Sequence, residues 1–159
     1  MKKVIFLFSI LILFSCKKEK QVFHVHNVNI EQNAVNKNHL KSTTEFISIA
    51  YFHLFEAVIP APDLSDLSVV HSSFGDKRLI EEMIIKSFLN EPSIQILQID
   101  RSSSSTINIF AQNMYTKLYN RTPDEYELWF VTDMIQKDTT LTSELIYFSL
   151  MTANEYRYY

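Results

Sequence analysis

Side chains that could do catalytic chemistry are few in this sequence, and they are scattered. His53 and Glu56 stand three residues apart, a helical spacing that more often gives a surface contact than a general base. The serine run at 102–105 has no flanking glycines, so it lacks the sharp turn that exposes a nucleophilic serine. Because no acid–base pair or triad is recognisable, the sequence predicts a protein that is not an enzyme.

Two histidines have a spacing that could suit a metal ion. Residues 23–30 alternate loosely between apolar and polar side chains, as in an extended strand, which would place His24 and His26 on one face. A zinc site needs at least one further protein ligand, and no third candidate stands nearby. We therefore expect a solvated or partner-docked strand here, with no metal site, and we predict no cofactor.

The single cysteine, Cys16, ends an apolar run near the amino terminus. Lys2 and Lys3 come first, followed by residues 4–14, which are apolar apart from Ser9. This is the pattern of a secretory signal, and the run is shorter than the roughly 20 residues that a helix needs to cross a bilayer. An ordinary signal anchor with an incidental cysteine is the alternative.

The sequence Leu13-Phe14-Ser15-Cys16 resembles the lipobox of bacterial lipoproteins. That resemblance implies that residues 1–15 are a signal peptide, that the Cys16 sulfur carries a diacylglycerol thioether, and that its amino group is acylated by a fatty acid such as palmitate. Several acyl chains anchor a protein durably, whereas one chain gives only marginal membrane binding. We therefore predict membrane attachment through Cys16, with a flexible, asparagine- and lysine-rich tether over 16–41.

The residues just after Cys16 help to predict on which side of the outer membrane the domain lies. The short signal and the composition resemble envelope lipoproteins of the Bacteroidota type, whose surface-exposed members usually carry an acidic cluster soon after the cysteine. Here residues 17–20 read Lys-Lys-Glu-Lys and are locally basic. The resemblance therefore implies an outer-membrane lipoprotein whose domain lies in the periplasm, with the cell surface as the alternative.

Charge and composition exclude some functional classes and favour one fold class. Without Lys2 and Lys3 the chain has 13 basic and 18 acidic side chains, a net charge near −5, so we predict that it does not bind nucleic acid. Hydrophobic residues make up 47% of the chain, enough for one packed core. Gly75 is the one glycine, which disfavours hairpin turns and favours an all-α fold.

The hydrophobic period from residue 42 to residue 159 predicts a domain of five to six helices. Thr43 or Thr44 would cap the first helix, a weak helix would cover 63–70, and a third would follow a cap at Asp76. Residues 93–100 fit a strand or a turn, and 101–106 form a serine-rich linker. In the second half we expect helices after 106, after a cap at Thr122, and from 140 or 141. Their expected buried faces include Val58, Leu79, Met83, Trp129 and Leu145, while Glu81 is expected in solvent.

The two halves of this domain have similar patterns. Residues 51–55 match 115–119, Ala61-Pro62-Asp63 matches Thr122-Pro123-Asp124, and apolar positions in 79–89 match those in 141–151. The sequence therefore predicts a three-helix unit in two copies, over 42–100 and 106–159. Chance similarity between amphipathic helices is the alternative.

A short stretch of the second half resembles a known module. The pattern formed by Tyr115, Leu118, Arg121, Pro123, Asp124, Leu128 and Trp129 is similar to the helical repeat of phycobilisome-linker-like modules of bacterial surface and scaffold proteins. That resemblance implies that Arg121 and Pro123 organise a turn between helices. It also implies scaffolding or adhesion.

Tyrosines gather towards the carboxyl end, and tyrosine is enriched at interfaces. We therefore hypothesise that Tyr156, Tyr158 and Tyr159 dock a partner; the alternative is that these rings seal the last helix onto the core.

The predicted function is a lipid-anchored, non-catalytic accessory or scaffold subunit of an outer-membrane protein assembly. The alternative is a small-ligand or glycan-binding lipoprotein, with a cleft between the two units lined by Trp129 and tyrosines.

Overall fold

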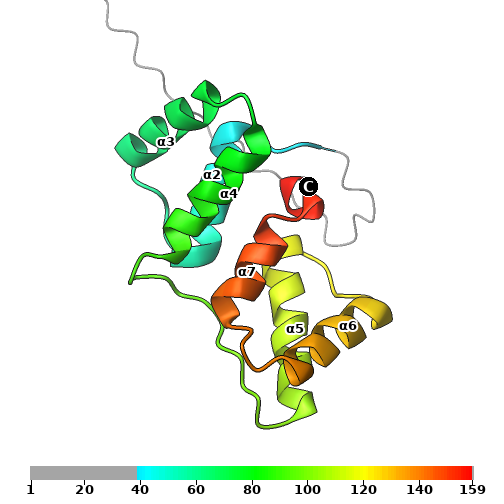
Figure 1. Cartoon of the computed structure of the whole chain (residues 1–159). Coiled ribbons are helices and arrows are strands. Elements are labelled where there is room, and N and C mark those ends of the chain that lie inside the picture. Colours follow the sequence, from blue (N-terminus) through cyan, green and yellow to red (C-terminus); the bar gives the residue numbers. More distant parts are fainter. Residues whose placement is uncertain (1–38, 159) are drawn as a thin grey trace, which may run out of the picture.

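The structure, a computed structural model, describes residues 39–158, which contain six α-helices, one short 3₁₀-helix and no strand (Figure 1). This confirms the all-α prediction. The elements in chain order are α2 (Thr43–Phe55), α3 (Ala61–Ser73), α4 (Lys77–Leu89), α5 (Ser104–Tyr119), α6 (Glu125–Lys137), α7 (Ser143–Met151) and the 3₁₀-helix η2 (Asn154–Arg157). The predictions about the signal peptide, Cys16 and the tether up to residue 38, like those about His24, His26 and Tyr159, lie outside the described residues.

The six helices form two units of three. Helices α3 and α6 have equal lengths, and α6 begins and ends 64 positions after α3. The same shift relates the ends of α2 and α5, at Phe55 and Tyr119. In each unit the second helix packs on the first, and α4 packs on α7 where the two units meet (Figure 1). The predicted match of Ala61-Pro62-Asp63 with Thr122-Pro123-Asp124 is wrong, because it needs a shift of 61 whereas the helices correspond at a shift of 64. The two units share their order of helices, and a duplication of the sequence stays a prediction.

The turn after the first helix of each unit has an unusual backbone. Glu56 follows α2 with φ 53°, and Asn120 follows α5 with φ 55°. Both residues therefore end their helices in the left-handed conformation, which disfavours side chains with a Cβ and which asparagine tolerates best after glycine. These two positions are also 64 residues apart, so the two units share this feature of the backbone.

Polar caps set where several helices begin. The predicted cap of the first helix at Thr43 or Thr44 is wrong by one or two residues, because Ser42 caps α2 and Glu45 completes a capping box. Asp124 caps α6 in the same way with Glu127. Helix α7 begins at Ser143 after a cap at Thr142, later than the predicted start at 140 or 141. Asp76 caps α4 as predicted. The predicted cap at Thr122 is wrong by two residues, because Asp124 takes that place. The serine-rich stretch contains the cap of α5, Ser103.

The connection between the units is extended chain without a strand partner. The Gln95 amide donates to the Leu54 carbonyl oxygen at 2.6 Å, the Leu97 amide to the Tyr147 hydroxyl at 3.1 Å, and the Ile99 amide to Ser143 Oγ at 3.0 Å. Satisfying these backbone groups lets the connection lie against the core. Its isoleucines at 94, 96 and 99 are partly buried there.

The buried core draws on both units and omits several residues expected in it. Its largest fully buried side chains are Ile47, Leu54, Ile85, Met114, Ile135, Tyr147, Met151 and Tyr156. Leu79, Met83, Leu145 and Val58, all expected on buried faces, are exposed instead. In α4 the core stripe is Ile80, Ile84, Ile85 and Phe88 together with Glu81, and Leu79 and Met83 lie on its outer flank.

Four consecutive residues at the end of the described chain contact four different parts of the molecule. Glu155 pairs with Arg121 before α6, Tyr156 packs on α2, and Arg157 pairs with Glu81 of α4. Tyr158 pairs in an isolated antiparallel bridge with Leu40. We call 155–158 the terminal clasp. It joins both units to the start of the described domain.

Candidate functional site

Within the clasp, Tyr156 is fully buried, with 0% of its surface exposed. Its hydroxyl lies 2.9 Å from His53 Nδ1, and its ring meets the Phe46 ring edge-on at 5.9 Å between centroids. Burial raises the pKa of this hydroxyl well above its usual value. The hypothesis of an exposed tyrosine patch is thus corrected for Tyr156, which seals the core instead. Tyr158 is partly exposed, and docking through Tyr158 and Tyr159 stays a prediction.

His53 is a second residue whose environment differs from the one expected. It faces Tyr156 within the core, and no His53–Glu56 contact is described; Glu56 instead pairs with Lys117 at 3.0 Å. Burial, with smaller contributions from the positive charges of Lys41 and Lys117, lowers the pKa of His53 to about 4. A neutral imidazole at this place joins α2 to the terminal clasp.

A buried polar cluster lies in the first unit, at residues that the sequence analysis did not single out or placed in solvent. His71 Nδ1 lies 3.2 Å from Thr43 Oγ1, and His71 Nε2 lies 3.5 Å from Glu81 Oε1. Glu81 also pairs with Arg157, with 2.9 Å between Arg157 Nε and Glu81 Oε2. The expectation that Glu81 is solvated is therefore wrong.

The order hydroxyl, imidazole, carboxylate in this cluster is the order of a catalytic triad, but its surroundings differ from those of one. His71 and Glu81 are both buried, and the Glu81 carboxylate is paired with the guanidinium of Arg157. His71 Nε2 is buried and makes no hydrogen bond to Glu81, so the bond by which a triad carboxylate orients its imidazole is missing. We therefore interpret the cluster as a structural contact between the first unit and the terminal clasp.

Arg121 lies in the turn between α5 and α6 and joins two carboxylates. Its guanidinium makes two hydrogen bonds to Glu127, both 2.7 Å, and two to Glu155, at 2.6 and 2.7 Å. It also lies over the rings of Tyr115 and Tyr119, at 5.2 and 5.7 Å from their centroids. The hydrogen bonds from Arg121 lower the pKa of the Glu127 carboxyl below its usual value. This is the position that the family resemblance implies for Arg121.

Pro123, the other residue expected at this turn, stands just before the capping residue Asp124. It restricts the preceding backbone to extended conformations, which keeps α6 from starting earlier. Glu127 serves two partners here, since Oε2 accepts from the Asp124 amide at 2.9 Å as well as from Arg121. The turn and the first residues of α6 therefore form one hydrogen-bonded unit.

Helix α6 presents three large aromatic side chains to solvent. Tyr126, Trp129 and Phe130 are 69%, 57% and 49% exposed. The Tyr126 centroid is 5.8 Å from that of Trp129 and 6.3 Å from that of Phe130. We call these three residues the aromatic face. The expectation that Trp129 is buried is wrong, because Val131, Thr132 and Ile135 form the buried side of this helix.

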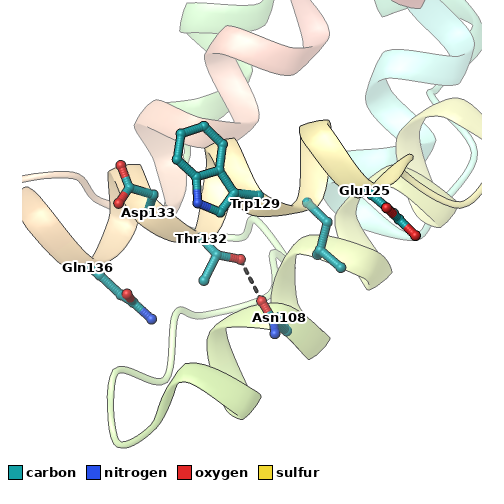
Figure 2. Close-up of a pocket in the computed structure, with 7 residues that line it drawn as sticks. Asn108, Glu125, Trp129, Thr132, Asp133 and Gln136 are labelled. Carbon is teal, nitrogen blue, oxygen red and sulfur yellow. Dashed lines mark hydrogen bonds between the residues drawn. The ribbon is translucent and has the colours of Figure 1, made fainter.

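A groove of about 340 Å³ lies beside Trp129, between α5 and α6 (Figure 2). Two of its lining residues, Asn108 of α5 and Thr132 of α6, point toward each other, and Thr132 Oγ1 donates to Asn108 Oδ1 at 2.6 Å. The remaining lining residues all belong to α6: Glu125, Leu128, Trp129, Asp133 and Gln136. The groove lies within the second unit, whereas the ligand-binding alternative expected a cleft between the units. The tyrosines expected beside Trp129 do not line it.

Comparison with known proteins finds no protein-family model, no curated protein sequence and no solved structure that matches this chain. The resemblances to bacterial lipoproteins and to phycobilisome-linker-like repeats therefore stay predictions.

Among residues 39–158 there is no helix both long and apolar enough to cross a membrane. That part of the chain also has no group of three or more histidine, cysteine or acidic side chains placed to hold a metal ion.

Replacement of Arg121 by methionine tests the turn. We expect the free energy of unfolding to fall by about 2 kcal/mol, because Glu127 and Glu155 lose their shared partner and face each other. The control is Arg78→Met, which removes an exposed pair with Glu82 and should change stability by about 0.5 kcal/mol or less. Urea unfolding measures both. Equal effects would contradict the role given to Arg121.

The depressed pKa of His53 predicts a pH dependence of stability. In the unfolded chain His53 takes up a proton near the ordinary histidine pKa of 6.5, whereas the folded protein does so only near 4. Stability contributed by the neutral imidazole is therefore complete above about pH 6.5 and is lost as the pH falls towards 4, by about 2–3 kcal/mol.

The matched variant is His53→Asn, whose amide can still hydrogen-bond to the Tyr156 hydroxyl but does not titrate. Urea unfolding at a series of pH values between 7 and 4.5 should show a steeper loss of stability in the wild type than in the variant. The carboxyl groups titrate in both proteins, so the difference isolates His53. Parallel curves would show that His53 protonates as easily in the folded protein as in the unfolded chain.

Proposed function

We propose that this protein is a lipid-anchored envelope protein that acts as a non-catalytic accessory or scaffold subunit of an outer-membrane protein assembly, and that the aromatic face of α6 contacts its protein partner. The observation that carries this proposal is the exposure of Tyr126, Trp129 and Phe130 on one helix. Exposed aromatic clusters on soluble domains mark interaction sites, and tyrosine and tryptophan dominate the binding energy of many interfaces.

A comparison of α3 with α6 indicates that a helix in this position of a unit can form without these rings. A shift of 64 residues relates α3 to α6 and places Pro62, Ser65 and Asp66 at the positions of Tyr126, Trp129 and Phe130. Helix α3 forms and packs on α2 with those residues in place. Large apolar side chains in solvent bring the domain no packing energy, so a role in binding explains them better than a role in folding.

The membrane attachment rests on the sequence around Cys16. Three acyl chains on one residue would hold the protein at the membrane and confine its search for partners to two dimensions. Such confinement raises the effective concentration of the aromatic face near membrane proteins, so an interface of three rings and their surroundings suffices. The basic residues after Cys16 favour the periplasmic face of the outer membrane, with the cell surface as the alternative.

A second candidate, binding of a small ligand or glycan, is favoured by the groove beside Trp129. The groove combines an exposed indole with amide, hydroxyl and carboxylate groups. Such a mixture of one apolar surface with a few polar groups is usual in ligand sites.

Lipidation is tested on the purified full-length protein. Intact-mass analysis should show a chain that begins at Cys16 and carries a diacylglycerol and a third acyl group. Growth with an alkyne fatty acid should label the wild type, and Cys16→Ser should carry no label because no other cysteine exists. A maleimide-reactive thiol in the wild-type protein would contradict the proposal.

The docking role is tested with the variant Tyr126→Gln/Trp129→Ser/Phe130→Asp. Two of these three changes introduce the residue found in α3, so stability should change by about 1 kcal/mol or less. Pull-down from native membranes in mild detergent, through a tag spaced beyond the carboxyl end, should recover a stoichiometric outer-membrane protein with the wild type and lose it with the variant.

The matched control is Phe52→Ser, which removes one exposed ring of α2 away from α6 and should retain the partner. Retention of the partner by the triple variant would show that another surface makes the contact. A wild-type protein that purifies alone would contradict the accessory role itself.

A further inference from the structure

We propose that the groove between α5 and α6 binds a neutral saccharide of one or two pyranose rings, with one ring stacked on Trp129. The inference rests on the ligand-binding candidate and does not depend on the docking role. It follows from the hydrogen-bonding groups that the groove offers, from the position of the indole, and from the charge of the lining (Figure 2).

One wall of the groove is a single stripe of α6. Glu125, Trp129, Thr132 and Gln136 follow one another at spacings of four, three and four, so they lie on one flank of the helix. The stripe covers a length of roughly 16 Å, since each residue of a helix rises about 1.5 Å. With a volume of about 340 Å³, the groove has room for one ring beside Trp129 and for a second along the stripe.

Internal hydrogen bonds fix which polar groups face a ligand. Thr132 Oγ1 donates to Asn108 Oδ1, which orients the amide and leaves its two N–H donors for a ligand. Gln136 Nε2 donates to Ser104 Oγ at 2.8 Å, which leaves the Gln136 carbonyl oxygen as an acceptor. Asp133 Oδ2 accepts from Lys137 at 2.9 Å, so Oδ1 is a second acceptor. Sugar hydroxyls both donate and accept, and therefore match this mixture.

The indole supplies the apolar part of the site. Trp129 is more than half exposed and borders the same polar groups. One face of a pyranose ring is made largely of C–H groups, which pack on the negative face of an aromatic ring. A stacked ring would place its hydroxyls at its edge, where the amides of Asn108 and Gln136 are available.

The charge of the lining selects among saccharides. Glu125 and Asp133 carry the charges, and no basic side chain lines the groove. A uronic acid, sulfate or phosphate group would therefore meet the negative charge of Glu125, and that of Asp133, which Lys137 offsets in part. A neutral sugar meets no such repulsion.

The internal repeat again separates what the fold needs from what the groove has. At the positions that correspond to Glu125, Trp129, Thr132 and Gln136, helix α3 has Ala61, Ser65, Ser68 and Ser72. Small residues at these positions are compatible with the helix and with its packing. The larger side chains that build the groove in the second unit are therefore not required for folding.

Trp129 is the one tryptophan of the chain, so its fluorescence reports on the groove. The full-length protein is titrated in a detergent without a sugar headgroup with maltose, cellobiose, lactose, mannobiose and chitobiose, and with digalacturonate as the acidic probe. We expect at least one neutral disaccharide to shift the emission to the blue and to protect Trp129 from acrylamide. We expect digalacturonate to bind at least about tenfold more weakly.

The test variant is Asn108→Asp, which keeps the oxygen that accepts from Thr132 and removes both N–H donors. We expect the affinity for the neutral sugar to fall about tenfold. Gln136→Ala, on the exposed side of α6, gives a second measurement should Asn108→Asp fail to fold. The control Tyr126→Gln/Phe130→Asp removes two rings of the aromatic face outside the groove and should retain sugar binding.

Three results would overturn the proposal: no neutral disaccharide changes the emission up to about 20 mM, digalacturonate binds as well as the neutral sugars, or the Asn108 and Gln136 variants bind as the wild type does. Failure of the docking role would leave these measurements unaffected, because Asn108 and Gln136 are not part of the aromatic face. Conversely, partner capture that survives in Asn108→Asp while sugar binding is lost would assign the two roles to separate surfaces.

Discussion

The burial of Tyr156 between the two helical units is the contact on which the arrangement of this domain depends. Its ring packs on α2, while the 3₁₀-helix that contains it packs on α5. The neighbouring residues extend the same contact in both directions, because Glu155 binds Arg121 of the second unit and Arg157 binds Glu81 of the first. Each three-helix unit is small, and neither alone would bury as much apolar surface as the two together. A clasp that contacts both units therefore turns two marginal structures into one domain.

A comparison of the two units separates the features that both share from those found in one unit. Features that both units share include the equal positions of α3 and α6, the left-handed residues Glu56 and Asn120, and the buried faces of α2 and α5. Features present in one unit include the aromatic face, the groove and the Arg121 turn, all in the second unit. The residues proposed for binding thus lie in the second unit, while the first unit provides the polar cluster around His71 that contacts the clasp.

The sequence predicted the helices well because helical periodicity and caps are local, and it predicted burial less well because burial depends on distant residues. Helix α6 has more apolar side chains than its buried side can accept, and periodicity alone assigned Trp129 to the core. Glu81 is buried because Arg157, 76 residues further on, supplies its counter-charge. The sequence analysis expected Thr122 to cap α6, but Asp124 is the cap because Glu127 completes the capping box there and is bound by Arg121. The sequence analysis missed the groove because its amides come from two helices, and local sequence patterns do not predict how two helices lie relative to each other.

The relative position of the two proposed binding surfaces on α6 depends on the rigidity of this helix. A capping box and the Arg121 bridge fix its first turn, and its buried side packs on α5. The aromatic face and the groove stripe therefore keep a constant relation, with Trp129 at their common border. The residues between Cys16 and His39 could span at most roughly 80 Å when fully extended, so the proposed anchor would place the domain near the membrane without dictating which side of α6 faces a partner. Orientation at a partner must then come from the surface itself, and rigid aromatic side chains, which lose little conformational entropy on binding, suit that task.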